Sequence, residues 1–157
     1  MADPLAAWAH NTRVLLTLLR LEMRVQRWRR LDPTLQALAV MAAAARIECS
    51  WCMDFGYWEF HHRGVDPGKL EDVTRWRSSA RYTDLERLVL EYADAMTDTP
   101  PSVTDDLVAG LRRHLSDAQV VELTSLVALE NMRSRANASL GLTSQGFKEE
   151  CELRPPA

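Results

Sequence analysis

Apolar residues recur at three- and four-residue spacing along most of this chain, which is the pattern of amphipathic helices rather than strands. The first such stretch covers residues 5–28 and follows Pro4, a residue suited to the first turn of a helix, so we expect one long N-terminal helix. An alanine-rich apolar stretch then covers residues 35–62 and ends at Gly64. It forms either one long helix or two helices that meet near Glu48.

The second half of the chain carries explicit helix start signals. Thr83 is followed three residues later by Glu86, and Ser116 by Gln119, and both pairs have the composition of a capping box. Helices are expected over residues 67–76, 85–96, 104–115 and 120–140. No alternating strand pattern is present in the sequence, so we predict an all-α fold of about six to seven helices.

The length of 157 residues suits a single domain with its own core. We divide the chain into an N-terminal helix (1–30), a helical domain (31–147) and a polar tail (148–157). The formal charge of −3 argues against binding of nucleic acid through net charge. We interpret a cluster of arginines as a solvated helix face: Arg20, Arg24, Arg27, Arg29 and Arg30.

Neither a membrane span nor an export signal is visible in the sequence. No apolar run approaches the roughly 18 residues needed to cross a bilayer. The start, Met-Ala-Asp-Pro, lacks the basic-then-apolar order of a signal peptide, so we expect a cytoplasmic protein. Cytoplasmic thiols are normally reduced, so a close cysteine pair is expected to be catalytic or metal-binding rather than structural.

Cys49 and Cys52 form a C-x-x-C pair, the most informative feature of the sequence. Residues three apart share a helix face, so the two thiols can form a reversible disulfide. If a helix begins near Ser50, its free N–H groups and dipole lower the pKa of the Cys52 thiol below its usual ~8.5. We therefore expect Cys52 to be the nucleophile. Cys151 lies alone in the polar tail and is interpreted as incidental.

A zinc site is the obvious alternative for such a pair, but helical geometry opposes it. The nearest further ligands are His61 and His62, and nine residues of helix place His61 roughly 13 Å from Cys52 along the axis. Zinc bonds measure about 2.0–2.3 Å, so these residues do not converge on one ion. We expect no metal and no cofactor, and we interpret both histidines as surface residues at a helix end.

The segment from Cys49 to Asp54 resembles the C-x-x-C-x-D-x-H segment of the carboxymuconolactone decarboxylase family, in its alkylhydroperoxidase D-like (AhpD-like) branch. Residues 88–97, 116–123 and 130–137 resemble the later helices of such proteins in order and spacing. The resemblance extends over residues 31–147 and implies a helical domain that assembles into a homo-oligomer, a trimer or a hexamer. It also implies a break that places the cysteines at a helix start.

The resemblance further implies a thiol peroxidase. In such proteins the second cysteine, here Cys52, reacts with a hydroperoxide, and an external dithiol reductant of lipoyl or thioredoxin type reduces the pair. The family histidine four residues after that cysteine is Gly56 here, and the family glutamate twelve residues before the first cysteine is Ala37. Because these groups move protons in the family, losing both costs on the order of 10²–10⁴ in rate unless they are replaced.

Two glutamates are the candidates for that replacement. Glu59 returns to the face of Cys52 after nearly two turns, and Gly56 leaves a slot between them that water can fill. Glu48 lies one turn before Cys52 if the helix is continuous there. For both, the alternative is a solvent-facing or ion-paired carboxylate. Asp54 points away and is interpreted as structural or as a cap. The expected catalytic residues are Cys52, Cys49 and Glu59.

Other side chains near the motif have open roles. Five aromatic residues form either a wall for an organic hydroperoxide or ordinary core: Trp51, Phe55, Tyr57, Trp58 and Phe60. Gly56 indicates either close packing or a deliberate slot. Four polar residues are expected to pack in the core or between subunits, with the thiol pocket as the alternative: Asn131, Arg133, Arg135 and Asn137.

Three functions follow from these observations. The first is a thiol-dependent peroxidase or disulfide oxidoreductase that uses Cys52 and Cys49. The second is lyase chemistry on a lactone acid, which in the family depends on the histidine replaced by Gly56. The third is a non-catalytic oligomeric binding protein that kept the fold.

Overall fold

The computed structural model describes residues 3–153, and within them it contains nine α-helices, one short 3₁₀ helix and no strand. The α-helices are α1 (Asp3–Ala9), α2 (Thr12–Val25), α3 (Pro33–Ile47), α4 (Ser50–His62), α5 (Pro67–Asp72), α6 (Asp84–Thr97), α7 (Asp105–Arg112), α8 (Asp117–Ser139) and α9 (Phe147–Leu153). The 3₁₀ helix, Val73–Arg75, continues α5. The all-α prediction is confirmed, with more helices than the six to seven expected.

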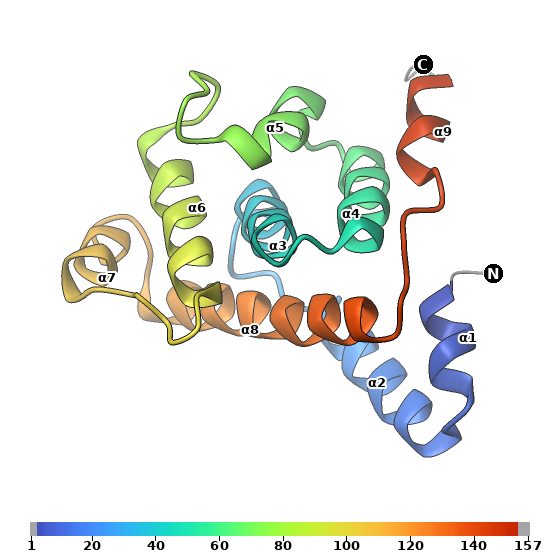
Figure 1. The fold of residues 1–157 in the computed structure, drawn as a ribbon. Coiled ribbons are helices and arrows are strands. Elements are labelled where there is room, and N and C mark those ends of the chain that lie inside the picture. The colour runs from blue at the N-terminus through green and yellow to red at the C-terminus, as the bar shows by residue number, and fades with distance from the viewer. Residues whose placement is uncertain (1–2, 154–157) are drawn as a thin grey trace.

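Helix α3 forms the centre of the molecule. It packs against α4, α6 and α8, and Figure 1 shows it nearly end-on between α4 and α6, with α8 below. Most of its alanines are buried, Ala39 and Ala43 completely, because small side chains allow the surrounding helices to approach closely. Leu38 and Met41 fill the remaining space on this helix. Both cysteines of the pair follow directly after it.

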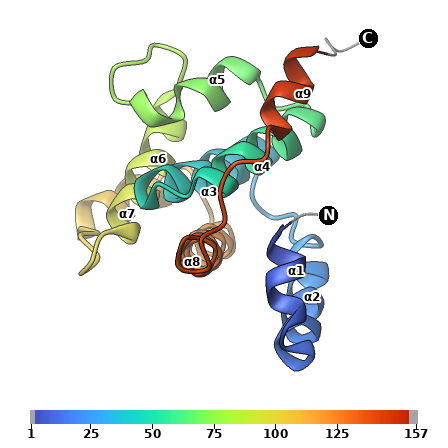
Figure 2. The same ribbon diagram turned by 45° about the vertical axis from the view of Figure 1, so that its right-hand side comes forward.

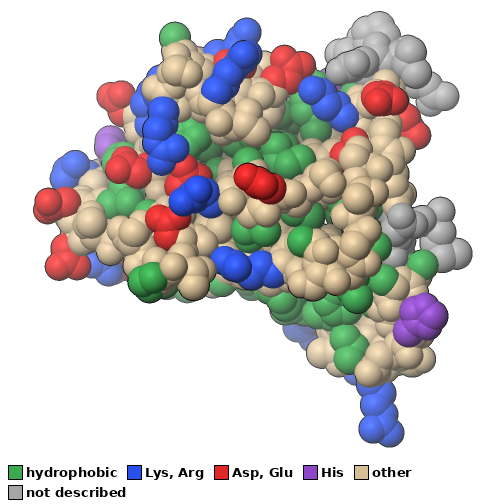
Figure 3. All heavy atoms as spheres, viewed as in Figure 1, with side chains coloured by type: hydrophobic (Ala, Val, Ile, Leu, Met, Phe, Trp, Pro, Cys, Tyr) green, Lys and Arg blue, Asp and Glu red, His purple; other side chains and the backbone are tan. Residues whose placement is uncertain are grey.

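The N-terminal region is a hairpin of two helices, so the prediction of one long helix over residues 5–28 is wrong. Asn11 interrupts it, because its side chain accepts a hydrogen bond from the backbone N–H of Val14 (3.3 Å) and caps α2. Figure 2 shows the α1–α2 hairpin beside the rest of the molecule rather than within it. Apolar side chains are exposed along the hairpin, among them Leu16, Leu19 and Met23 (Figure 3).

The C-terminal region also differs from expectation. The segment predicted as a polar tail from residue 148 forms most of α9, which packs against α4 (Figure 1), while residues 154–157 lie outside the described part. Cys151 is buried in the main apolar core rather than exposed in a tail. Cys151 therefore lies within the packed part of the molecule, and its interpretation as functionally incidental stays a prediction.

The helix caps expected in the second half are present. Thr83 with Glu86, and Ser116 with Gln119, both form reciprocal capping boxes. Helix α8 ends just before Gly141, which adopts the left-handed conformation with φ of 71° that ends many helices. No helix between residues 3 and 153 is both long and apolar enough to span a membrane.

Candidate active site

The cysteine pair lies at a break between two helices, which decides the alternative left open by the sequence. Glu48 adopts a left-handed conformation (φ 61°) and ends α3, and α4 begins two residues later at Ser50. Since α3 and α4 are not continuous, the condition under which Glu48 would face Cys52 is not met. Glu48 is exposed and does not line the cavity described below.

The two cysteines form a disulfide, with their Cα atoms 5.3 Å apart. Cys49 is the N-cap of α4, and its Sγ accepts the backbone N–H of Cys52 at 3.3 Å. The helix start predicted near Ser50 is confirmed. This N–H group points at the sulfur of Cys49, whereas the sequence led us to expect the N–H groups of the helix start to act on Cys52.

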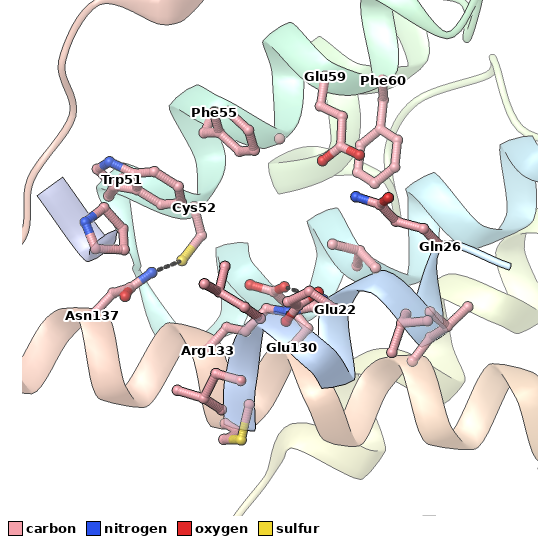
Figure 4. Close-up of a pocket in the computed structure, with 18 of the residues that line it drawn as sticks. Glu22, Gln26, Trp51, Cys52, Phe55, Glu59, Phe60, Glu130, Arg133 and Asn137 are labelled. Atoms are coloured by element: carbon pink, nitrogen blue, oxygen red, sulfur yellow. Dashed lines mark hydrogen bonds and ion pairs between the residues drawn. The ribbon is translucent and has the colours of Figure 1, made fainter. Parts of the chain in front are cut away.

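Cys52 opens into a cavity of about 460 Å³ between α2, α4 and α8 (Figure 4). Cys52 is 7% exposed and lines this cavity, whereas Cys49 is 2% exposed and does not. A molecule in the cavity therefore meets the sulfur of Cys52. The cavity is largely apolar, and its apolar lining includes Trp8, Leu15, Leu18, Leu19, Val25, Val40, Trp51, Phe55, Phe60, Leu126 and Met132.

The aromatic residues around the motif divide between the two roles considered above. Trp51 stacks on Phe55, and both line the cavity beside Cys52 (Figure 4). Tyr57 is a core residue, and Trp58 stacks on neighbouring rings outside the cavity. The wall that an organic molecule would contact is thus formed by successive turns of one face of α4.

Helix α8 brings polar side chains to the cavity. Asn137 is buried, and its Nδ2 donates a hydrogen bond to Cys52 Sγ at 3.4 Å, drawn in Figure 4. Arg133 also lines the cavity, while Asn131 and Arg135 bond to Thr97 on α6 instead. The expectation that all four polar residues pack in the core or between subunits is therefore wrong for Arg133 and Asn137, which both line the thiol cavity.

Glu130 is a buried carboxylate in the same cavity, 3% exposed. It accepts hydrogen bonds from Ser134 Oγ (2.6 Å) and Arg133 Nη1 (3.4 Å). Burial raises the pKa of Glu130 despite the opposing effects of Arg133 and Ser134. Arg133 in turn forms two hydrogen bonds to Glu22 of α2, at 2.6 and 2.8 Å. The sequence reasoning did not single out Glu130, although its spacing of seven from Asn137 puts both on one helix face.

On the α4 side, no side chain replaces the family histidine. A Cβ at Gly56 would lie 2.6 Å from Met41 Sδ, so Gly56 allows close packing against α3. Gly56 also lines the cavity together with Cys52 and Glu59. Ala37, at the position of the family glutamate, is completely buried.

Glu59 combines the two roles considered for it. It lines the cavity, but its side chain is 37% exposed and pairs with Arg63 at 3.4 Å. Its catalytic role stays a prediction.

Asp54 is a cap, as its position on the far face of α4 suggested. Its carboxylate accepts four backbone N–H groups, from Gln145 and Gly146 just before α9 and from Phe147 and Lys148 in its first turn. Burial alone would raise the pKa of Asp54, but these hydrogen bonds outweigh it and the pKa is lowered. Asp54 therefore fixes the C-terminal helix beside the cysteine segment.

The two histidines differ in exposure. His62 is exposed, whereas His61 is half-buried and stacks on Tyr57, so the surface interpretation is right for His62 alone. Among residues 3–153, no cluster of three potential His, Cys, Asp or Glu ligands could bind a metal ion.

Comparisons with known proteins agree with this picture. The chain is 36% identical to the uncharacterised protein YnjA of Escherichia coli (strain K12) over 117 residues, which cover 74% of this chain and 64% of YnjA. It is 27% identical to the uncharacterised protein Rv2313c of Mycobacterium tuberculosis (strain ATCC 25618 / H37Rv) over 93% of this chain and 51% of that protein. The chain thus spans between half and two thirds of the length of these relatives.

Solved structures share the fold. ATU0492 from Agrobacterium tumefaciens, described as a protein of unknown function and a candidate antioxidant defence protein AhpD, superposes with a TM-score of 0.82 at 25% identity, over 88% of this chain and 94% of that one. The debrominase Bmp8, solved as a cysteine-to-alanine variant in complex with 2,3,4-tribromopyrrole, gives a TM-score of 0.81 at 16% identity over 90% and 76% of the two chains. At that identity the likeness to Bmp8 concerns the fold alone.

The family model confirms the resemblance of the cysteine segment and places it within a wider match. The model for the carboxymuconolactone decarboxylase family matches residues 13–95, which is more than half of the chain and includes α3, the cysteine pair and α4. The all-helical arrangement around α3 also matches the AhpD-like structure of ATU0492. This chain therefore belongs to the carboxymuconolactone decarboxylase family, with an AhpD-like fold.

Proposed function

We propose that this protein is a thiol-dependent peroxidase, with Cys52 as the nucleophile and Cys49 as the resolving thiol. The observation that carries the proposal is the position of the pair: a disulfide whose one accessible sulfur, Cys52 Sγ, lines a largely apolar cavity. Such a cavity suits an organic hydroperoxide, because its apolar part is removed from water while its peroxide group meets the sulfur.

The reaction that fits this geometry has three steps. The Cys52 thiolate attacks the terminal oxygen of the hydroperoxide, the O–O bond breaks, and the alkoxide leaves as an alcohol after receiving a proton. The Cys49 thiolate then attacks the sulfur of the resulting sulfenic acid and forms the disulfide. The departing hydroxide takes up the proton that Cys49 lost and leaves as water. An external dithiol supplies the two electrons and two protons that regenerate both thiols.

The reductant and the assembly belong to the same proposal. Since Cys52 is nearly buried, the geometry favours a dithiol on a slender arm, such as a lipoyl group, over a thioredoxin-like protein surface. We also propose a homo-oligomer, a trimer or hexamer, because the α1–α2 hairpin exposes Leu16, Leu19 and Met23.

Stopped-flow reaction of the reduced protein with cumene hydroperoxide tests the proposal. We expect Cys52→Ser to remove the fast reaction, and Cys49→Ser to keep the first step but accumulate a sulfenic acid that dimedone traps. Cys151→Ser is the matched control, because Cys151 is buried away from the cavity and should leave the rate unchanged. A wild-type rate no faster than that of a free thiol would overturn the proposal.

The two other functions have less support from the site. Lyase chemistry depends in the family on the histidine, and here Met41 occupies the space beside Gly56. A binding protein without catalysis needs no accessible sulfur. Normal activity in cells with both cysteines replaced by serine would favour the binding protein over the peroxidase.

A further inference from the structure

One face of α8 carries four polar side chains, three of which line the cavity. Glu130, Arg133, Ser134 and Asn137 follow at spacings of three and four, so they share this face over two helical turns. Asn137 contacts Cys52 Sγ, and Glu130 and Arg133 line the cavity (Figure 4). The polar chemistry near the sulfur thus comes from α8.

Three carboxylates line the cavity, and their surroundings differ. Glu22 forms a two-bond ion pair with Arg133, and Glu59 is partly exposed and paired with Arg63. Glu130 is 3% exposed and lines the cavity, and its contact with Arg133 is the longer one at 3.4 Å. Because burial raises the pKa of Glu130, this carboxylate can take up and release a proton closer to neutral pH than an ordinary glutamate.

We propose that Glu130 is the acid–base group of the peroxidase reaction, in place of the missing family histidine and glutamate. This inference rests on the proposed function. The Glu130 carboxylate receives the thiol proton of Cys52, and returns it to the alkoxide oxygen when the O–O bond breaks, so Glu130 begins and ends the step ionised. Two turns of α8, about 10 Å along its axis, separate Glu130 from Asn137, and the proton crosses this gap through water in the cavity.

The charged and titratable groups that face Glu130 define the pH dependence. Arg133 and Ser134 contact it from its own helix, Glu22 approaches from α2 through Arg133, and Cys52 shares the cavity from α4. From α3, the neutral Gln36 lines the cavity. The reactive form has one proton shared between Cys52 and Glu130, so the wild-type rate falls both at low pH, where both are protonated, and at high pH, where neither is.

The test combines Glu130→Gln with a matched control on the same helix. Glu122 is also buried on α8, but it accepts the backbone N–H groups of Arg30 and Leu31 and does not line the cavity. We expect Glu130→Gln to slow the reaction with cumene hydroperoxide about 10²-fold at pH 7. The decrease of the reaction rate at high pH should disappear in this variant. Its Cys52 should be alkylated by iodoacetamide at least as fast as in the wild type, because a negative neighbour is gone. Glu122→Gln should lower stability without changing the pH profile.

The outcomes separate the inference from the proposed function. A fast wild type together with an unchanged rate or an unchanged high-pH fall in Glu130→Gln overturns the role of Glu130 alone. A wild type no faster than a free thiol overturns the proposed function, and the inference with it. If Glu130→Gln does not fold, Ser134→Ala provides the test: losing its hydrogen bond to Oε1 should move the high-pH fall to higher pH, and an unmoved profile contradicts the inference.

Discussion

The α4 side and the α8 side of the cavity contribute differently to the site. Helix α4 supplies the thiols and an apolar wall of Trp51 and Phe55, while Gly56 packs against Met41 and Asp54 caps α9. Helix α8 has no thiol, yet it provides Asn137 and Glu130 at the sulfur and in the cavity. In the proposed site, the thiols therefore come from one helix and the acid–base group from the facing helix.

Substitutions on the two helices should have different effects. Changes on α4 away from the cysteines should mainly lower the free energy of unfolding, whereas changes on the cavity face of α8 should mainly alter the reactivity of Cys52.

Replacement of Asp54 should have the largest effect, and it should fall on stability. Asp54→Ala removes the acceptor of four backbone N–H groups at the start of α9, so we expect the free energy of unfolding to fall by about 3 kcal/mol in urea titrations. The Cys52 alkylation rate of the folded protein should change less than about twofold. If Asp54→Ala kept the wild-type stability but changed the alkylation rate of Cys52, the expected difference between the two helices would be wrong.

The pH dependence of stability gives Asp54 a second signature. Its pKa is lowered in the folded protein, so the stability it contributes is fully present above the unfolded pKa of about 4 and is lost as pH falls through the lower folded pKa. Asp54→Asn should therefore flatten the loss of stability below about pH 4, measured by urea unfolding at several pH values. An acid limb identical to that of the wild type would contradict the capping role.

Replacement of Asn137 should affect the thiol directly. Asn137→Asp exchanges the donor at 3.4 Å from Cys52 Sγ for an acceptor with negative charge, so the thiolate is destabilised. We expect reaction of Cys52 with iodoacetamide at pH 7 to slow about tenfold, and its pH profile to move to higher pH. Asn131→Asp is the matched control on the same helix, because Asn131 bonds to Thr97 and Val127 outside the cavity. Equal slowing in both variants would remove Asn137 from the site.

Much of the fold was predictable because its signals are local. The capping pairs at Thr83 and Ser116 fix helix starts through hydrogen bonds within four residues, and these predictions are confirmed. The break at Asn11 was missed, because the apolar periodicity continues on both sides of this residue. An asparagine in such a stretch does not by itself show that it caps a new helix. The helix around Cys151 was missed, because its start depends on Asp54, a residue more than ninety positions away.

The site was predictable only along α4. The spacing of Cys49 and Cys52 is a local property, and so is the helix start beside them. The contact of Asn137 with Cys52 and the burial of Glu130 arise from packing of α8 against α3 and α4, which no spacing within one segment reveals. Likewise, the occupation of the space beside Gly56 by Met41 depends on how two helices meet.

Substitution of Gly56 should have a smaller effect on stability. Alanine gains about 1 kcal/mol in helix propensity, but its Cβ would lie 2.6 Å from Met41 Sδ, and such overpacking typically costs about 1–3 kcal/mol. We expect Gly56→Ala to lower the free energy of unfolding by about 1 kcal/mol. In a Met41→Ala background the same change should become stabilising, since the sulfur is gone. Additive effects in this double-mutant cycle would argue for an open slot at Gly56.

Glu59 provides the finest test, because it lies on α4 yet lines the cavity. Its carboxylate is partly exposed and pairs with Arg63, so water screens its influence on the sulfur. We expect Glu59→Gln to slow peroxide reduction about threefold, far less than the roughly 10²-fold expected for Glu130→Gln. Measuring both variants over the same pH range ranks the two carboxylates. If Glu59→Gln instead removed the decrease of the reaction rate at high pH, Glu59 rather than Glu130 would transfer the proton. The thiol and its acid–base group would then both lie on α4.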